Sequence, residues 1–285
     1  MEERRQLLNV AYRLLGSLAD AEDVVQEAYA RWYALEQEQR DEIVVPGAWL
    51  TTVTSRICLD LLGSARVRRE RYVGEWIPEP LPPQSEEGDP ADRVTLDESV
   101  NMAFLVVLEN LTPAERVAFV LHDVFRYSFA EVAGIVGRTP GACRQLATSA
   151  RRRIREARVG TESRQRRAGV VRAFAQAWAA RDIAALVGLL DPQAMAVSDG
   201  GGIVPAALEP ITGAERIAEG LVEIMRLAGL VLHERMVNGQ PGLVAELDNQ
   251  TSTVMAFEIS GDRITRIWAV RNPEKLRTWT RGTVG

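Results

Sequence analysis

A proline-rich, acidic segment at residues 77–90 constrains the fold more than any other feature, because it interrupts a chain patterned mainly for helices. Proline lacks the backbone N–H that a helix interior needs, and mixed prolines and acidic residues favour an extended chain. We therefore predict that this segment forms no helix and contributes nothing to a hydrophobic core. It separates one helical region before it from a second one after it.

The region before the segment is predicted to contain helices at residues 5–35 and 47–70. In the first, Asp20 can cap a helix whose apolar residues follow at helical spacing. In the second, Pro46 stands where a helix start tolerates proline. Its apolar face is formed by Leu50, Val53, Ile57 and Leu61.

The region after the segment carries two capping boxes, Thr112 with Glu115 and Ser128 with Glu131. The turn at 137–140 then begins a basic helix that runs to about residue 158, which is the pattern of a helix-turn-helix. A buried stripe is expected on the side of Cys143. The opposite arc could enter a DNA major groove and holds Arg144, Gln145, Thr148, Ser149, Arg151, Arg152 and Arg155.

The pattern changes again after residue 165, where helices come first and strands follow. This order predicts an α+β domain with a curved sheet. The expected helices are 168–180, 182–190 and 213–227, and the expected strands are 194–199, 230–238, 243–250, 253–260 and 263–271.

Composition matters chiefly through the distribution of charge. The net charge of -5 hides an arginine cluster at 144–172, a second at 66–71, and an acidic stretch at 75–98. Such local asymmetry suits a polyanionic partner better than the net charge suggests. No apolar run approaches the roughly 18 residues that span a bilayer, so we expect a cytoplasmic protein without membrane association.

Metal, thiol and cofactor chemistry are not expected. The two cysteines, Cys58 and Cys143, lie far apart on predicted helices, where a lone cysteine is usually a small core residue. The two histidines, His122 and His233, have no companion ligands nearby. We therefore predict no metal site and no cofactor.

Several motifs together resemble a known family. Residues 20–29 (DAEDVVQEAY) resemble the core-polymerase-binding helix of sigma domain 2, and residues 111–158, beginning LTPAER, resemble sigma domain 4. Residues 72–81 (YVGEWIPEPL), 199–202 (DGGG) and 272–276 (NPEKL) resemble motifs of the subgroup with a SnoaL-like C-terminal extension. The chain is thus similar to extracytoplasmic-function (group IV) sigma factors of the sigma-70 family.

The resemblance implies two all-α domains and a C-terminal α+β cone-shaped domain. Sigma domain 2 would span residues 1–72, an acidic linker 73–97, sigma domain 4 residues 98–160, and a SnoaL-like regulatory domain 165–285. The implied partners are core RNA polymerase, promoter DNA and, within the chain, contacts of the C-terminal domain with the sigma domains and linker.

The resemblance also assigns roles to individual residues. Core polymerase would be bound by Asp20, Asp23, Gln26 and Glu27. The −10 promoter element would be captured by the loop at 36–46 and by Arg56, Asp60, Ser64, Arg66, Arg68 and Arg69, whereas the helix-turn-helix arc would bind the −35 element. Regulatory contacts would be made by Trp76, Asp199, Gly200, Gly201, Gly202, Asn272, Pro273, Glu274 and Lys275.

This sequence departs from the family pattern at three positions. Leu146 stands where many sigma domain-4 helices carry arginine, Glu75 replaces a usual proline, and Ile203 replaces the lysine that usually follows the glycine motif. The −35 and regulatory contacts of this chain therefore need not follow those of other family members.

Three functions remain open at this point. The first is promoter-specific transcription initiation, with a non-enzymatic C-terminal domain that has a regulatory role. In that domain the glycine run would let another backbone approach closely, and Asn272-Pro273 would present Glu274 and Lys275 to a neighbouring segment. The second is a one-component helix-turn-helix regulator with a ligand-sensing C-terminal domain. The third is an isomerase or cyclase, with Asp199 as acid–base group at the rim of a cavity. The expected cavity residues are Trp178, Met195, Asp199, His233, Met255 and Trp268.

Overall fold

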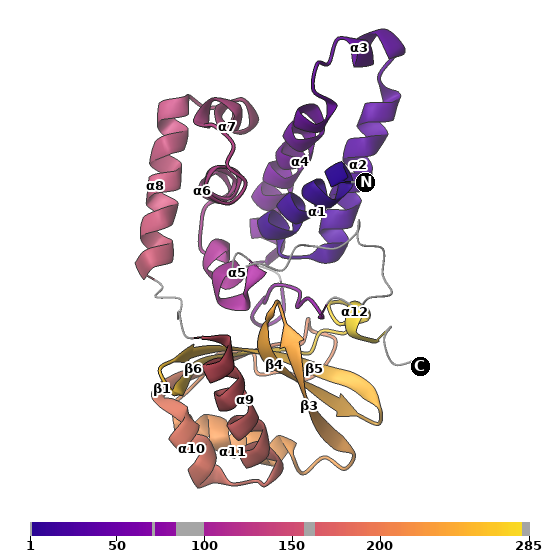
Figure 1. Ribbon diagram of the computed structural model, residues 1–285. Helices are drawn as coiled ribbons and strands as arrows, with labels where there is room; N and C mark the ends of the chain where they lie inside the picture. The colour runs from indigo at the N-terminus through magenta and orange to yellow at the C-terminus, as the bar shows by residue number, and fades with distance from the viewer. Residues whose placement is uncertain (1, 70–71, 84–99, 157–162, 281–285) are drawn as a thin grey trace. The chain divides into compact units, whose positions relative to one another are not determined.

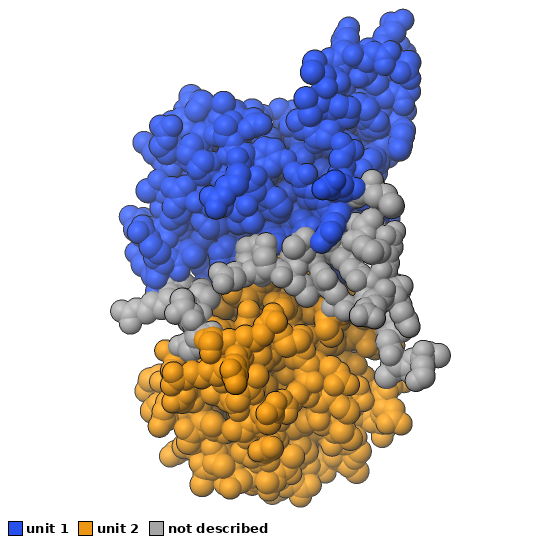
Figure 2. All heavy atoms as spheres, in the orientation of Figure 1, with its two compact units in different colours: residues 1–70, 84–99, 104–158 blue, residues 71–83, 100–103, 159–285 orange. Residues whose placement is uncertain are grey.

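The computed structural model describes residues 2–69, 72–83, 100–156 and 163–280. These residues form two compact units (Figure 2). Residues 2–69 and 104–156 belong to the first unit. Residues 72–83, 100–103 and 163–280 belong to the second, so the described part of the predicted linker groups with the C-terminal domain.

The first unit begins with a helical layer formed by α1 (Glu2–Leu15), α2 (Leu18–Ala34), α3 (Gln37–Asp41) and α4 (Pro46–Arg69) (Figure 1). Gly16 adopts φ of 69° and ends α1, and the side chain of Ser17 caps α2 by accepting from the Asp20 amide at 3.2 Å. Helices are therefore present within residues 5–35 as expected, but the expected Asp20 cap is wrong, because Ser17 takes that position. Glycine tolerates the left-handed conformation that breaks the helix.

The rest of the first unit is made of α5 (Met102–Glu109) from Phe104 onward, α6 (Pro113–Phe119), a π-helical turn (Val120–Val124), α7 (Phe129–Val136) and α8 (Pro140–Glu156). Both predicted capping boxes are confirmed. The Glu115 amide donates to Thr112 Oγ1, and the Glu131 amide donates to Ser128 Oγ, each at 3.3 Å. Gly137 closes α7 with φ of 71°, so α7 and α8 form the predicted helix-turn-helix.

The second unit is a six-stranded sheet with helices packed against it (Figure 1). The helices are α9 (Arg164–Ala179), α10 (Ile183–Leu189), α11 (Ala214–Ile224) and the short α12 (Arg277–Thr280). The strand order is β2 (Ile211–Thr212), β1 (Leu190–Asp199), β6 (Arg263–Val270), β5 (Gln250–Ser260), β4 (Gln240–Leu247) and β3 (Leu230–Val237).

Only β1 and β6 pair in parallel among the strands of this sheet. The expected α+β order is confirmed, although the two-residue strand β2 was not expected. Register shifts at 245/246 and 258/259 bend the sheet, as bulges do. The core between α9, α10, α11 and the sheet includes Phe174, Trp178, Leu186, Phe257 and Ile267.

Residues 72–83 contain neither helix nor strand, as the prolines predict. The prediction that this segment stays out of a hydrophobic core is wrong, because Ile77 is 1% exposed and Leu81 is 5% exposed. Glu79 is buried as well. Residues 84–97 of the predicted linker lie outside the described residues.

No helix among the described residues is both long and apolar enough to cross a membrane. The described residues likewise contain no group of three or more histidine, cysteine or acidic side chains that could hold a metal ion.

Candidate functional site

The outer arc of α8 is the candidate DNA-reading surface of the first unit. Cys143, Ala147 and Ala150 are buried along one side of this helix. The Arg144 guanidinium lies 5.3 Å from the centre of the Phe129 ring, which holds it at the start of the helix. The exposed residues of the predicted set are Arg144, Gln145, Thr148, Arg152 and Arg155.

Two residues of the predicted α8 set face the interior of the first unit. Ser149 Oγ donates to Glu115 Oε1 at 2.7 Å, and Arg151 donates to both carboxylate oxygens of Asp123 at 2.7 and 3.1 Å. Burial opposes ionisation of Glu115, but hydrogen bonds from Thr112 and Ser149 outweigh it and hold the pKa of its carboxyl below the ordinary value. Ser149 and Arg151 therefore stabilise the helix-turn-helix and are not part of its free arc.

The polar face of α2 is the candidate polymerase-binding surface. Ala21, Val24, Val25 and Ala28 are buried on the opposite side of the helix. Of the predicted residues, Glu27 accepts a hydrogen bond from Arg31 at 2.9 Å on the helix surface. All four are exposed along one face: Asp20, Asp23, Gln26 and Glu27.

The third candidate surface, on α4, is only partly free. Arg56 donates to the Gly134 carbonyl in α7 at 2.7 Å, so it bonds across the first unit. Ser64 donates to the Leu61 carbonyl at 2.9 Å, and Asp60 is exposed. Arg66, Arg68 and Arg69 lie in the last turns of α4, but their side chains are outside the described residues.

A buried arginine joins the two helical regions of the first unit, which the sequence did not predict. Arg116 of α6 is 2% exposed, and it donates to the Leu14 carbonyl of α1 at 2.9 Å and to Glu109 Oε1 at 2.7 Å. Burial lowers the pKa of Arg116 to about 9, and Glu109 supplies the counter-charge of the protonated guanidinium. Tyr127 adds a second link by donating to Thr51 Oγ1 at 3.2 Å.

The second unit contains a buried polar cluster at the end of β1. Asp199 is fully buried, and its carboxylate accepts from Tyr72 Oη at 2.6 Å, Lys275 Nζ at 2.6 Å and the Ile77 amide at 3.0 Å. Lys275 also donates to the Ile77 carbonyl at 2.5 Å and lies 4.1 Å from the Trp76 ring centre. Burial, followed by the hydrogen bond to Asp199, raises the pKa of the Tyr72 hydroxyl.

Asn272 completes this cluster by donating to Tyr72 Oη at 2.9 Å. We call Asp199, Asn272 and Lys275 the clamp, and residues 72–81 the clamped segment. Lys275, the only lysine of the chain, is 8% exposed. Lys275 is thus buried against Ile77 of the clamped segment, whereas Glu274 is exposed. Pro273 is exposed beside it.

A second contact holds the far end of the clamped segment. The Asn238 side chain accepts from the Leu81 amide at 3.0 Å and donates to the Val100 carbonyl at 2.8 Å. Trp279 donates to the Pro80 carbonyl at 2.9 Å. One asparagine thus bonds to the chain on both sides of the stretch 82–99. Neither Asn238 nor Trp279 was singled out from the sequence, because no local motif marks them.

The glycine run after Asp199 allows close approach, but at Gly201 and Gly202 the close neighbours are side chains and not the backbone that was expected. A Cβ atom on Gly201 would lie 2.3 Å from Asn272 Nδ2, and one on Gly200 would lie 2.3 Å from the Val204 carbonyl oxygen. A Cβ atom on Gly202 would lie 3.0 Å from Val73 Cβ of the clamped segment. Gly201 and Gly202 also have positive φ, which other residues rarely adopt.

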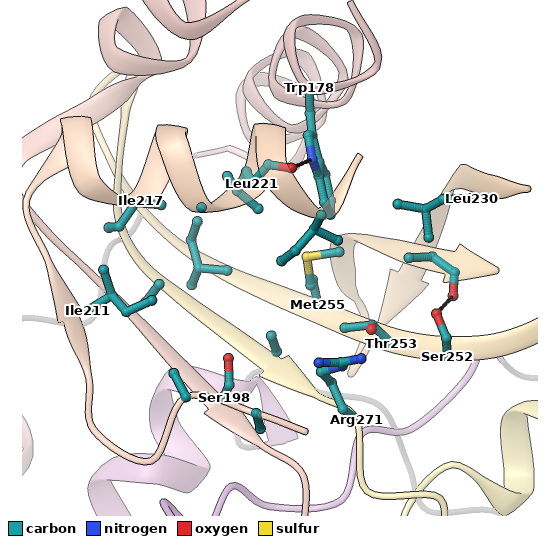
Figure 3. A pocket seen from close by; sticks show the side chains of 18 of the residues that line it. Trp178, Ser198, Ile211, Ile217, Leu221, Leu230, Ser252, Thr253, Met255 and Arg271 are labelled. Atoms are coloured by element: carbon teal, nitrogen blue, oxygen red, sulfur yellow. Dashed lines mark hydrogen bonds between the residues drawn. The ribbon is translucent and has the colours of Figure 1, made fainter. Parts of the chain in front are cut away.

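Asp199 does not occupy the position that an acid–base role requires. A cavity of about 180 Å³ lies between α11 and the sheet, and Trp178 and Met255 line it as expected (Figure 3). Four other expected residues are not among the lining residues: Met195, Asp199, His233 and Trp268. The Asp199 carboxylate is buried in the clamp, which also corrects the suggestion that it sits at a cavity rim.

Comparisons with known proteins cover both helical regions. The sigma-70 region 2 model matches residues 1–68, and the sigma-70 region 4 model matches residues 101–154. The ECF RNA polymerase sigma factor SigJ of Mycobacterium tuberculosis is 36% identical over 287 residues, covering 96% of this chain and 90% of that protein.

Two further comparisons extend over the C-terminal domain. A probable ECF RNA polymerase sigma factor of M. tuberculosis, SigI, is 37% identical over 278 residues, covering 96% of this chain and 92% of that protein. The crystal structure of M. tuberculosis SigJ matches with a TM-score of 0.77 at 34% identity, covering 97% of this chain and 96% of that chain.

Proposed function

The chain belongs to the extracytoplasmic-function (ECF) RNA polymerase sigma factors, and on that premise we propose that its C-terminal domain regulates it through the clamped segment. As a sigma factor it binds core RNA polymerase and directs promoter-specific transcription initiation. The observation that carries the proposed regulation is the buried Asp199 carboxylate, which bonds to both Tyr72 and Ile77 of the clamped segment.

The proposed division of labour follows the three helical surfaces. The exposed face of α2, with Asp20, Asp23, Gln26 and Glu27, contacts core polymerase. The α4 residues Arg56, Asp60, Ser64, Arg66, Arg68 and Arg69 bind the −10 element, where cationic side chains can track the phosphates of an opened strand. The free arc of α8 reads the −35 element through base edges and phosphates, using Arg144, Gln145, Thr148, Arg152 and Arg155.

The clamp limits how far apart the two DNA-binding regions can move. Residues 70–101 connect α4 to α5. If no part of this connection is bound, it can span the largest distance, because an extended chain reaches roughly 3.3–3.6 Å per residue. The clamp and Asn238 bind this chain near both of its ends, at Tyr72, Leu81 and Val100. Release of these contacts would lengthen the tether between the two regions.

The C-terminal domain is proposed to be a SnoaL-like, non-enzymatic domain. Its curved sheet covered by helices is consistent with that fold class. Its best acid–base candidate, Asp199, is not available for catalysis in the cavity. The Asp199 carboxylate pairs with Lys275 and lies outside the cavity lining. A buried carboxylate held by a cation and several donors is a structural contact in this setting.

Run-off transcription with purified core polymerase on a genomic promoter library tests the regulatory role. The test variants are Asp199→Asn and a chain lacking residues 165–285, and the matched control is Asp262→Asn at an exposed turn. Both test variants should bind core polymerase but change the amount of promoter-specific transcript, while the control matches the parent. Unchanged transcript from both test variants would refute regulation by the clamp.

A one-component repressor is the other reading of a helix-turn-helix fused to an α+β domain. The match of sigma-70 region 2 to residues 1–68 argues against it, because a simple repressor has no use for a polymerase-binding helix. Co-purification separates the two: Asp23→Ala and Gln26→Ala together should weaken retention on core polymerase. If the double variant is retained on core polymerase as well as the parent, this face of α2 is not part of the polymerase interface.

A further inference from the structure

The cavity of the second unit is apolar along most of its wall. It has a volume of about 180 Å³ and lies between α11 and the concave face of the sheet, with Trp178 of α9 at one end (Figure 3). An engineered cavity of about 150 Å³ holds benzene, so this one has room for a slightly larger molecule. Its aliphatic wall includes Ile211, Ile217, Leu221, Leu230, Met255 and Ile267.

Two polar groups of the wall are already satisfied within the domain. Trp178 Nε1 donates to the Leu221 carbonyl at 2.6 Å, and Ser252 Oγ donates to the Ala245 carbonyl at 3.0 Å (Figure 3). These groups have partners and need nothing from a ligand. They leave the Trp178 end of the cavity effectively apolar.

The remaining polar groups gather where β1, β5 and β6 lie side by side. Ser198 pairs with Ala269 across β1 and β6, and Ala269 pairs with Met255 across β6 and β5. Because alternate residues share a face, Thr253 and Arg271 lie on the same side of the sheet as these positions. Figure 3 shows the Arg271 guanidinium pointing into the cavity beside Thr253.

These groups have unused hydrogen-bonding capacity. In the part of the chain that the structure describes, the Ser198 and Thr253 hydroxyls have no hydrogen-bond partner, and Arg271 has no carboxylate partner. Arg271 donates one hydrogen bond, to the Pro205 carbonyl, whereas a guanidinium has five donors. Partial burial lowers the pKa of Arg271, which reflects the cost of keeping its charge away from water.

We propose that this cavity binds a small carboxylate with an apolar body, whose carboxylate group pairs with Arg271 and whose body fills the apolar wall. A guanidinium can bind a carboxylate through two parallel hydrogen bonds, and none of the described residues that line the cavity is acidic and could compete for it. The same charge arrangement would repel an amine of equal size.

The position of the site connects it to the clamp. Ser198 and Arg271 each precede a clamp residue, and the amides of Arg271 and Asn272 both donate to the Asp199 carbonyl, at 2.7 and 2.9 Å. A ligand that moved Arg271 would therefore act on the backbone that holds the clamped segment. This effector role rests on the proposed function, whereas binding itself does not.

Three probes that differ only in the head group test the binding site. Phenylacetate, 2-phenylethanol and phenethylamine are titrated into the full-length protein by isothermal calorimetry. Phenylacetate should bind saturably, with the alcohol about tenfold weaker, where tenfold corresponds to ~1.4 kcal/mol, and the amine should not bind. Failure of phenylacetate to bind, or equal binding of acid and amine, would overturn the proposal.

Variants then separate the charge from the cavity. Arg271→Gln should abolish the preference for acid over alcohol, Arg271→Lys should keep part of it, and Arg216→Gln on the exposed surface of α11 should change nothing. Ala269→Leu should fill the cavity and weaken acid and alcohol alike. Circular dichroism confirms that each variant is folded, and an unchanged acid preference in both Arg271 variants would contradict the assignment.

Transcription assays with and without phenylacetate distinguish this proposal from the regulatory one. Binding that leaves transcription unchanged would retain the site and reject its effector role. Absence of binding, together with altered transcription by Asp199→Asn, would reject the site and leave the proposed function intact.

Discussion

In each unit a buried cation hydrogen-bonds to a segment distant in sequence, and Arg116 and Lys275 do so in different ways. Arg116 in the first unit connects α6 to the end of α1 and pairs with Glu109, so it joins one helix to another. Lys275 in the second unit pairs with Asp199 and bonds to the Ile77 carbonyl, so it joins a folded domain to a segment with no helix or strand.

The difference shows how each unit uses its polar residues. Helices satisfy their own backbone groups, so α2 and α8 need no distant side chain to pair their backbones, and their outer arcs are exposed. The clamped segment forms no helix or strand that would pair its backbone groups, and the burial of Ile77 and Leu81 removes those groups from water. The second unit therefore supplies Asp199, Lys275 and Asn238 as their hydrogen-bond partners.

The largest effect is expected from Lys275→Met, which leaves the buried Asp199 carboxylate without its cation. Removing one partner of a buried ion pair costs roughly 3–5 kcal/mol, and urea denaturation of the full chain measures it. Arg277→Met is the matched control, because its ion pair with Glu274 is exposed. The double variant Asp199→Asn with Lys275→Met should recover part of the loss. If Lys275→Met lowers the free energy of unfolding no more than Arg277→Met does, the clamp does not stabilise the second unit.

A smaller loss is expected from Arg116→Leu in the first unit. The Leu14 carbonyl and Glu109 lose their partner, and an unsatisfied buried polar group costs about 1–3 kcal/mol. Arg138→Leu, at an exposed turn, should stay within about 0.5 kcal/mol of the parent. The double variant Arg116→Leu with Glu109→Leu should be more stable than Arg116→Leu alone. If it is not, the broken ion pair is not the source of the lost stability.

The capping box of α7 should contribute about 1 kcal/mol, measured as the loss in Ser128→Ala by urea denaturation at neutral pH. Hydrogen bonds from the Ser128 side chain and amide hold the pKa of Glu131 below its ordinary value. A carboxyl with a lowered folded-state pKa stabilises the fold above its unfolded-state pKa and loses this effect as pH falls.

The pH dependence gives the same box a second test. The destabilisation by Glu131→Ala should therefore shrink as the pH falls from about 5 to about 3. Ser64→Ala on the exposed face of α4 serves as the control. A loss from Glu131→Ala that is independent of pH would mean that the charge of the carboxylate does not matter to the cap.

The smallest effect on stability, and the sharpest contrast within one helix, is expected from neighbouring arginines of α8. Arg151→Gln should cost less than about 1 kcal/mol of stability through loss of its ion pair with Asp123. Arg152→Gln should leave stability unchanged but weaken promoter DNA binding and reduce its salt dependence by about one counterion. Denaturation and DNA titration at several salt concentrations distinguish the two, and equal effects of both variants on DNA binding would contradict the inward assignment of Arg151.

Local chemistry explains which structural predictions succeeded. The boxes at Thr112 and Ser128 involve side chains that bond to backbone three residues away, so nearby sequence contains all the partners. The start of α2 was misplaced at Asp20 because apolar spacing does not locate a helix end, and only the backbone conformation of Gly16 reveals the turn. Arg151 and Arg152 look alike on a helical wheel, and only the position of Asp123 separates them.

By itself, the sequence determined the helix-turn-helix, the α+β order of the C-terminal domain and the absence of helix in the described residues 72–83. These properties depend on residues a few positions apart, through capping, periodicity and the missing N–H of proline. Only the tertiary structure decided that the same proline-rich segment is buried. Its partners, Asp199 and Lys275, lie more than a hundred residues away, and composition carries no information about which distant side chains will satisfy a buried backbone group.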